Sequence, residues 1–214
     1  MVKPIHIYAA YVVIFAAFFL LILAVPIASF QEDESGWYQI LSATCHQKIS
    51  RSLCIFSDYG IGDCTSQSGV FIDSRADRLQ TSVIVDGKTG YKMPVCARDF
   101  GLYGAILLVA LAYPLIRKLD DTRVPPVIWL ILAIVPLAID GSVQMLSDLG
   151  WVPFAYESTN LIRVLTGVIA GGAASMYAIP LLMNMFGDDN RYIAPTKIDG
   201  QKNEAKKDGS GNRR

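Results

Sequence analysis

The sequence has few charged residues and no excess of either sign. Only 18% of its 214 residues are charged, and 19 Lys and Arg balance 19 Asp and Glu. Without an excess of positive charge, no nucleic-acid partner is expected. A Gly-rich phosphate-binding loop is missing, and so is any internal repeat of the kind that many transporters carry. These absences argue against nucleotide-driven chemistry and against a repeat-built transporter.

Long apolar runs dominate the composition instead. Of all residues 52% are apolar, and windows of about 20 apolar residues are typical of membrane-spanning helices. Four such runs cover about 8–30, 101–117, 126–148 and 160–186, and the second has uncertain ends that could reach back to Val95. The first run is longer than the apolar part of a secretory signal, so a retained anchor is favoured over a cleaved signal. The predicted fold class is therefore an all-α integral membrane protein with four transmembrane helices.

The connection between the first two spans, residues 31–98, is the one long loop. It contains a short apolar stretch at 37–41 that predicts an interfacial helix, and a Gly-rich, turn-like stretch at 59–63. Residues 70–72 and 82–85 resemble short strands, and the turn at 86–90 has the glycines of a β-hairpin. We expect a small, partly β, cysteine-containing insertion on the extracytoplasmic side, and four units: 1–30, 31–98, 99–186 and a disordered cytoplasmic tail, 187–214.

Positive charge predicts the orientation in a cell membrane. The short 117–125 loop holds Arg117, Lys118 and Arg123, and the C-terminal tail is rich in Lys and Arg, whereas residues 149–159 have neither. The positive-inside rule places both termini and the 117–125 loop in the cytoplasm. The lipid bilayer is then the first expected partner of this multi-pass protein.

With this topology, polar residues from three spans converge near the outer face. They are Arg98, Asp140, Gln144, Asn160 and Arg163. Asp140 and Gln144 are four residues apart and share one helix face, and a carboxylate within a span needs a partner. Arg163 is the expected counter-ion of Asp140, either at a binding site or as a packing clamp between spans.

The fourth span has sequence signals for its N-terminal cap and for a close helix contact. Residues 158–160 fit its N-cap, and Glu157 lies where a helix dipole favours an anion. Gly167 and Gly171 have the small-xxx-small spacing that lets helix backbones approach closely. We expect a close helix contact there, within the chain or with a partner.

All four cysteines lie in the long connection, which suggests an oxidising compartment. One interpretation is a Zn or Cu site formed by Cys45, His46 and Cys96, with Cys54, Cys64, Asp99 or water as a fourth ligand. The favoured interpretation is two disulfides, with Cys54–Cys64 and Cys45–Cys96 as the preferred pairing, and a reactive thiol is a third possibility. Four cysteines allow three pairings, so the sequence leaves the choice open.

Four motifs in order resemble a widespread archaeal and bacterial family of small predicted membrane proteins of unknown function. They are Cys45-His46-Gln47 with Arg51-Ser52, Pro94-Val95-Cys96-Ala97-Arg98, Asp140-Gly141-Ser142-Val143-Gln144, and Glu157-Ser158-Thr159-Asn160 with Arg163. The resemblance implies a compact helical membrane domain with these polar residues grouped near one face, and it supplies no reaction. Here about 40 residues separate the Arg-Ser and Pro-x-Cys motifs, more than is usual in the family, which implies that Cys54 and Cys64 belong to an insertion.

Two functions compete at this point. One is an outward-facing Cys/His/Arg/Asp site that binds a metal ion or an anionic or lipid ligand, with or without catalysis. The other is a non-catalytic accessory subunit of a larger membrane complex, for example a membrane metallo-oxidoreductase such as a copper-dependent monooxygenase. A four-span transporter is less favoured because the spans hold few charges.

Overall fold

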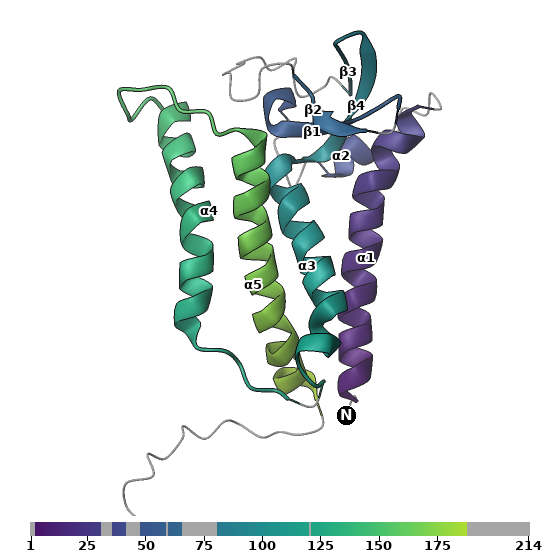
Figure 1. Ribbon diagram of the computed structural model, residues 1–214, viewed down its shortest axis with the longest axis vertical. Helices are drawn as coiled ribbons and strands as arrows, with labels where there is room; N and C mark the ends of the chain where they lie inside the picture. The colour runs from purple at the N-terminus through teal and green to yellow at the C-terminus, as the bar shows by residue number, and fades with distance from the viewer. Residues whose placement is uncertain are drawn as a thin grey trace, which may run out of the picture.

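The computed structural model describes residues 3–30, 36–41, 48–58, 60–65, 81–119 and 121–187. The four long helices lie side by side, with a small sheet across one end of the bundle (Figure 1). In chain order the described elements are α1 (Pro4–Ser29), α2 (Trp37–Leu41), the 3-10 helix η1 (Ile49–Arg51), β1 (Ser52–Phe56), β2 (Ile61–Asp63), β3 (Ser82–Val85), β4 (Lys88–Cys96), α3 (Ala97–Ile116), α4 (Val127–Asp148) and α5 (Asn160–Phe186).

Within these ranges, α1, α3, α4 and α5 are long and apolar enough to cross a membrane. They lie within a few residues of the four expected spans, and α2 confirms the short helix expected at 37–41. The uncertain second span begins at Ala97, so Arg98 and Asp99 lie in its first turn. Cys96 ends β4 and directly precedes α3, so the sheet continues into this span without an intervening loop.

α3 and α5 pack with their backbones almost in contact. A Cβ on Gly167 would overlap the carbonyl oxygen of Arg98, and one on Gly171 would overlap that of Leu102. Gly101 meets the backbone of Val164 in the same way from the other helix. The small-residue spacing therefore serves a contact within the chain, because only glycine permits this approach.

α1 covers the other side of α3 and α5. Their shared core consists of Tyr11, Ile106, Ala110, Tyr113, Ile179 and Met183. The Tyr8 hydroxyl adds a hydrogen bond of 2.9 Å to the carbonyl oxygen of Ala110. α1, α3 and α5 thus form a packed three-helix unit.

The sheet has the order β2-β1-β4-β3, and all neighbouring strands are antiparallel. Asp86 and Gly87 have φ values of 50° and 76°, as a tight hairpin turn requires, so the predicted hairpin and the 82–85 strand are confirmed. The predicted Cys54–Cys64 disulfide is also present. Residues 61–63 are a strand rather than a turn, and the strand expected at 70–72 lies outside the described residues. The chain is mostly helical, but four paired strands make a purely all-α description too narrow.

α4 packs on α5 and is shifted along its axis toward the sheet. Its only buried residues are Asp140 and Gln144, while its apolar side chains face outward. Figure 1 shows that it starts above the lower ends of α3 and α5 and rises past their upper ends. It ends in a tight cap, in which the N–H groups of Gly150 and Trp151 bond back to Ser147 and Leu146 and Gly150 has a positive φ of 69°.

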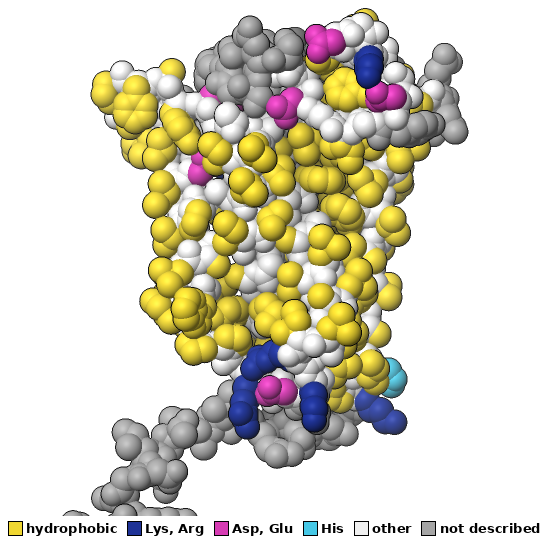
Figure 2. All heavy atoms as spheres, viewed as in Figure 1, with side chains coloured by type: hydrophobic (Ala, Val, Ile, Leu, Met, Phe, Trp, Pro, Cys, Tyr) yellow, Lys and Arg dark blue, Asp and Glu magenta, His cyan; other side chains and the backbone are white. Residues whose placement is uncertain are grey.

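The two ends of the bundle differ in charge. We call the end with the sheet the sheet end, and the end with Lys3, Arg117, Lys118 and Arg123 the basic end. Figure 2 shows the Lys and Arg side chains of the basic end below an apolar belt. α1 begins and α5 finishes at this end. The pattern agrees with the predicted orientation, and the cytoplasmic placement of the basic end stays a prediction.

Candidate functional site

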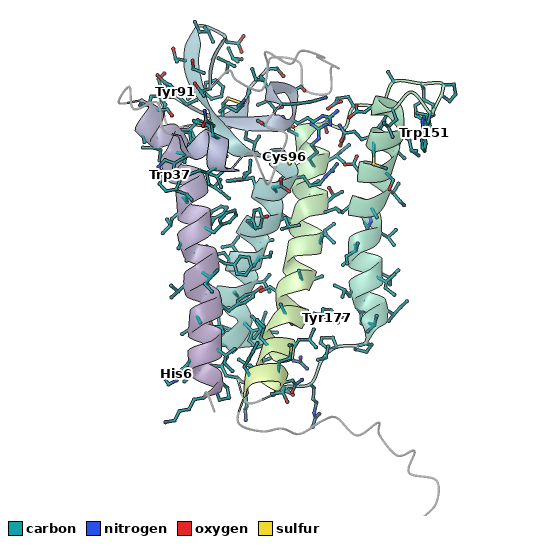
Figure 3. All side chains as sticks on the ribbon, turned by 180° about the vertical axis from the view of Figure 1, so that it is seen from behind. His6, Trp37, Tyr91, Cys96, Trp151 and Tyr177 are labelled. Carbon is teal, nitrogen blue, oxygen red and sulfur yellow. A yellow bond between two sulfur atoms is a disulfide. The ribbon has the colours of Figure 1, made fainter. Side chains whose placement is uncertain are left out.

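Polar side chains from α3, α4, α5 and η1 form one connected cluster at the sheet end. The five residues predicted from sequence all belong to it: Arg98, Asp140, Gln144, Asn160 and Arg163. The structure adds Arg51, Asp148, Tyr156 and Glu157. Figure 3 shows side chains of this region between Cys96 and Trp151, with His6 and Tyr177 toward the other end.

The pairing expected between Asp140 and Arg163 is wrong. Asp140 accepts a hydrogen bond from Nη2 of Arg98, with which it forms an ion pair, and its other oxygen accepts from the Tyr156 hydroxyl at 2.9 Å. Arg163 instead forms an ion pair with Glu157. Both arginines lie in the first turns of their helices, and the rotation of those helices decides which one faces α4.

Glu157 connects three elements. Its two carboxylate oxygens accept hydrogen bonds from Nε and Nη2 of Arg51 at 2.8 Å each, and from Arg163. The Gln144 side-chain amide donates to it at 2.9 Å. Burial opposes the ionisation of Glu157, but hydrogen bonds and charge from Arg51 and Arg163 outweigh it, so the pKa of this carboxyl lies below its usual value. Glu157 is therefore ionised and holds η1, α4 and α5 together.

Arg51 is the residue that sequence reasoning left without a role. It also binds both carboxylate oxygens of Asp148, at 3.0 Å, and so links the strand layer to the last turn of α4. Burial lowers its pKa, yet the two carboxylates raise it further, so the net pKa lies above the usual value. The only sequence feature that could have identified Arg51 was the Arg51-Ser52 motif of the family resemblance. Its position in a long connection gave no other reason to select it.

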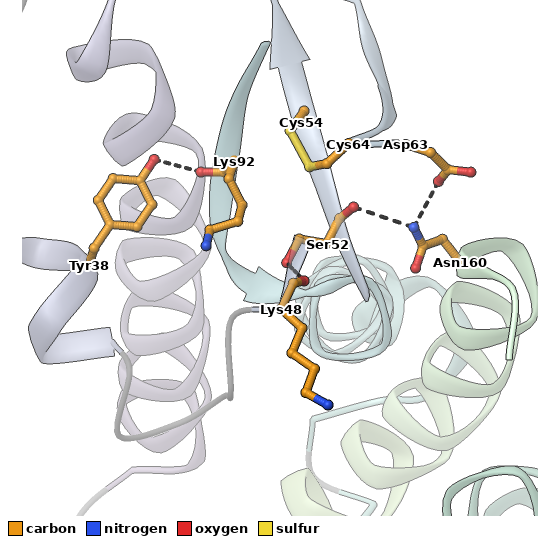
Figure 4. Close-up of a disulfide and its surroundings, with 8 residues drawn as sticks. All are labelled: Tyr38, Lys48, Ser52, Cys54, Asp63, Cys64, Lys92 and Asn160. Carbon is orange, nitrogen blue, oxygen red and sulfur yellow. Dashed lines mark hydrogen bonds between the residues drawn. A yellow bond between two sulfur atoms is a disulfide. The ribbon is translucent and has the colours of Figure 1, made fainter. Parts of the chain in front are cut away.

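Asn160 and Arg163 fasten α5 to the strands. The Asn160 amide donates to the carbonyl oxygen of Ser52 at 3.3 Å and to Oδ1 of Asp63 at 3.0 Å, next to the disulfide (Figure 4). Arg163 donates to the carbonyl oxygen of Ser50 at 3.3 Å and to Oδ1 of Asn160 at 3.0 Å. The expected N-cap is confirmed at Thr159, whose hydroxyl accepts from the N–H of Ile162. The sheet is thereby docked on the start of α5.

The sulfur part of the predicted site is described only at Cys96. Its Sγ donates to Oδ2 of Asp99 at 3.1 Å, across the first turn of α3. Cys45 and His46 lie outside the described residues. Among the residues that the structure describes, no group of three or more His, Cys, Asp and Glu side chains is placed to hold a metal ion.

The cluster is balanced in charge but not in hydrogen bonding. Three arginines, at positions 51, 98 and 163, face three carboxylates, at positions 140, 148 and 157. Arg98 uses Nη2 for Asp140 and, at 3.5 Å, for Gln144, while its Nε is buried without a hydrogen-bond partner among the described residues. Within the described residues, Arg98 is the one arginine of the cluster with an unsatisfied buried donor.

Comparisons with known proteins agree with the resemblance seen in the sequence. The family described as "Predicted membrane protein (DUF2085)" matches residues 77–177, which include α3, α4 and most of α5. The uncharacterized protein MJ1492 of Methanocaldococcus jannaschii is 30% identical over 186 residues, covering 83% of this chain and 94% of the relative. No solved structure matches the chain. The chain belongs to the DUF2085 family of predicted membrane proteins.

Proposed function

We propose that the cluster at the sheet end is an outward-facing site that binds one anionic group, a phosphate or a carboxylate, through Arg98. The observation that supports it is the buried Nε of Arg98, which has no hydrogen-bond partner among the described residues. A buried N–H without a partner costs about 1–3 kcal/mol, and a charged acceptor regains more than a neutral one. An anionic oxygen is the ligand that best completes this guanidinium.

The other two arginines support the choice of Arg98. Arg51 directs Nε and Nη2 at two carboxylates, and Arg163 divides its donors among Glu157, Asn160 and a backbone carbonyl. A ligand that bound either of them would have to break these bonds. Arg98 has an unused edge, and 21% of its side chain is exposed.

The surroundings of Arg98 leave room for its guanidinium. Gly141 of α4 faces it, and a Cβ at Gly141 would lie 3.3 Å from Nη1. Asp140 stays bound to Nη2 and to Tyr156, so it orients the planar group and keeps its Nε edge fixed. A preoriented guanidinium binds a phosphate or carboxylate with little loss of side-chain freedom.

The test compares ligand-dependent stabilisation in the wild type and in Arg98→Lys. Lysine keeps the positive charge beside Asp140 but lacks the Nε donor, so the variant should fold and lose the site. Arg123→Gln, which removes an exposed arginine at the basic end, is the matched control. Thermal unfolding would be followed in detergent with added phosphatidylglycerol, phosphatidylcholine, or inorganic phosphate against chloride at equal ionic strength.

We expect wild type and Arg123→Gln to be stabilised by the same anion, and Arg98→Lys to be stabilised far less. At a hundredfold excess over the dissociation constant the gain is about 2.7 kcal/mol. A response to phosphatidylglycerol alone identifies a lipid headgroup, and an equal response to phosphate identifies a soluble anion. If no anion stabilises the wild type, or all three proteins respond equally, the proposal is wrong.

A metal site is the second candidate, favoured by the contact between Cys96 and Asp99. A thiolate at the start of a helix is stabilised by the helix dipole and can share a metal with a nearby carboxylate. In this proposal Cys45 and His46 supply the remaining ligands of Zn or Cu. Elemental analysis of the purified protein should then find about one equivalent of metal, and Cys96→Ser should lose it while Cys54→Ser keeps it. Equal metal content in both variants, or none in the wild type, would exclude this candidate.

A further inference from the structure

α4 starts at a different level along the bundle axis from α3, and this difference does not depend on any ligand at Arg98. Asp140 pairs with Arg98, which is the second residue of α3. From the level of this pair to the basic end, α3 continues for 19 residues, Arg98 to Ile116, whereas α4 has only 13 residues on that side of Asp140, Val127 to Ile139. At 1.5 Å per residue these are about 28 Å and about 20 Å.

The remaining distance on the α4 side is crossed by non-helical backbone. The carbonyl oxygens of this segment accept from side chains of the bundle: Thr122 from Asn184 at 2.9 Å, Arg123 from Arg117 at 2.7 Å, and Pro126 from Tyr177 at 2.5 Å. Asn184 and Tyr177 are seven residues apart on α5, so the segment climbs about 10 Å along this helix. Pro125 and Pro126 remove two N–H groups that would otherwise need partners there.

The first turn of α4 nevertheless keeps polar groups that hydrocarbon does not satisfy. The Trp129 N–H bonds to the Pro126 carbonyl oxygen at 3.1 Å, whereas the N–H groups of Val127 and Ile128 have no acceptor within the helix, and the N-cap residue Pro126 provides no side-chain cap. Asn184 also has a buried Oδ1 without a hydrogen-bond partner among the described residues. Lipid tails cannot pair such groups, whereas water and headgroups can.

From these observations we infer that the bilayer is locally thinned beside α4, with headgroups and water of the basic-end leaflet reaching the start of this helix. Measured from the level of the Asp140–Arg98 pair toward the basic end, the helical surface reaches about 20 Å on α4 and about 28 Å on α3. A short apolar span is accommodated by a thinner bilayer at modest cost per ångström. Trp129, three residues after Pro126 and 63% exposed, then lies at the water–lipid interface, where tryptophan is preferred.

The native tryptophans allow a direct test, because the chain has only three, at positions 37, 129 and 151. Trp37→Phe with Trp151→Phe leaves Trp129 as the single fluorophore. The matched control places the single tryptophan on α3 by Leu108→Trp with all three native tryptophans replaced by Phe. Leu108 is 10 residues from Arg98 and Trp129 is 11 from Asp140, so the two positions lie at nearly the same level below the Asp140–Arg98 pair. Both side chains are exposed on the outside of the bundle, Leu108 by 67% and Trp129 by 63%.

Both proteins are reconstituted in phosphatidylcholine vesicles with bromine atoms either near the headgroup end or deep in the acyl chains. We expect Trp129 to be quenched most by the shallow bromines and the α3 tryptophan most by the deep ones. Equal, deep quenching of both would mean that α4 starts inside unthinned hydrocarbon, and equal, shallow quenching would mean that no local difference exists. Either result overturns the inference. Leu111→Trp replaces Leu108→Trp if that protein does not fold, and it should also be quenched more deeply than Trp129.

Discussion

Removing the charge of Glu157 is the sharpest test of the cluster. In Glu157→Gln the side chain keeps its shape, but Arg163, which is 1% exposed, loses its counter-ion, and Arg51 keeps only Asp148. Removing one partner of a buried ion pair costs about 3–5 kcal/mol, because the other charge is left without compensation. We expect the lower half of this range, about 3 kcal/mol, since Asn160 and the Ser50 carbonyl still accept from Arg163.

The measurement is unfolding of the detergent-purified protein by increasing SDS, followed by circular dichroism. Asp58→Asn is the matched control, because its partner Lys88 and Asp58 itself are exposed, and loss of an exposed pair should leave the midpoint unchanged. The double variant Glu157→Gln with Arg163→Gln should regain part of the lost stability, because it leaves no buried charge at that contact. A Glu157→Gln midpoint indistinguishable from that of Asp58→Asn would refute the reasoning.

Three further predictions concern other contacts of the fold. Because the pKa of Glu157 is lowered, its contribution to stability is fully present above the usual carboxyl pKa of 4.5 and is lost as pH falls through the lowered pKa. Between pH 6 and pH 3 the wild type should therefore lose more stability than Glu157→Gln. Parallel curves of stability against pH for the two proteins would contradict this. Gly167→Ala should destabilise by about 1–3 kcal/mol, because its Cβ meets the Arg98 carbonyl, whereas Gly172→Ala meets only Val109 Cγ2 at 3.5 Å and should be close to neutral in the same SDS titration. Cys54→Ser should lower stability by about 2–4 kcal/mol through loss of the Cys54–Cys64 cross-link, and reduction of the wild type should reproduce the loss; a reduced protein as stable as the oxidised one would exclude this contribution.

The helices were predictable from the sequence because apolar length and composition determine them almost alone. The hairpin at Asp86-Gly87 was predictable as well, since these two residues take positive φ and the turn needs it. β1 was missed because its nearby partner β2 lies in a Gly-rich stretch expected to be a turn, and its other partner β4 begins more than 30 residues later. Local sequence patterns identified the helices and the hairpin. The pairing of strands that lie far apart in the long connection could be seen only in the structure.

For the site, the sequence predicted which polar residues lie at the same depth near one membrane face. It did not predict which of them form ion pairs with one another. The positive-inside rule placed Arg98, Asp140 and Arg163 near one face, and all three belong to the cluster. Their pairing depends on the rotation of α3 and α5 and on the axial shift of α4, and neither has a signature in a single sequence. Arg51 and Tyr156 lie in connections, where periodicity carries no information. The metal ligands at positions 45 and 46, and the expected partner subunits, stay predictions.

The most direct test of the anion site is a count of bound anions by native mass spectrometry. The protein would be released from vesicles that contain phosphatidylglycerol and phosphatidylcholine in equal amounts, in buffer with inorganic phosphate. The account predicts one bound anion, as lipid or as phosphate, on the wild type and on Arg123→Gln, and none on Arg98→Lys. A bound anion retained equally by Arg98→Lys would contradict it.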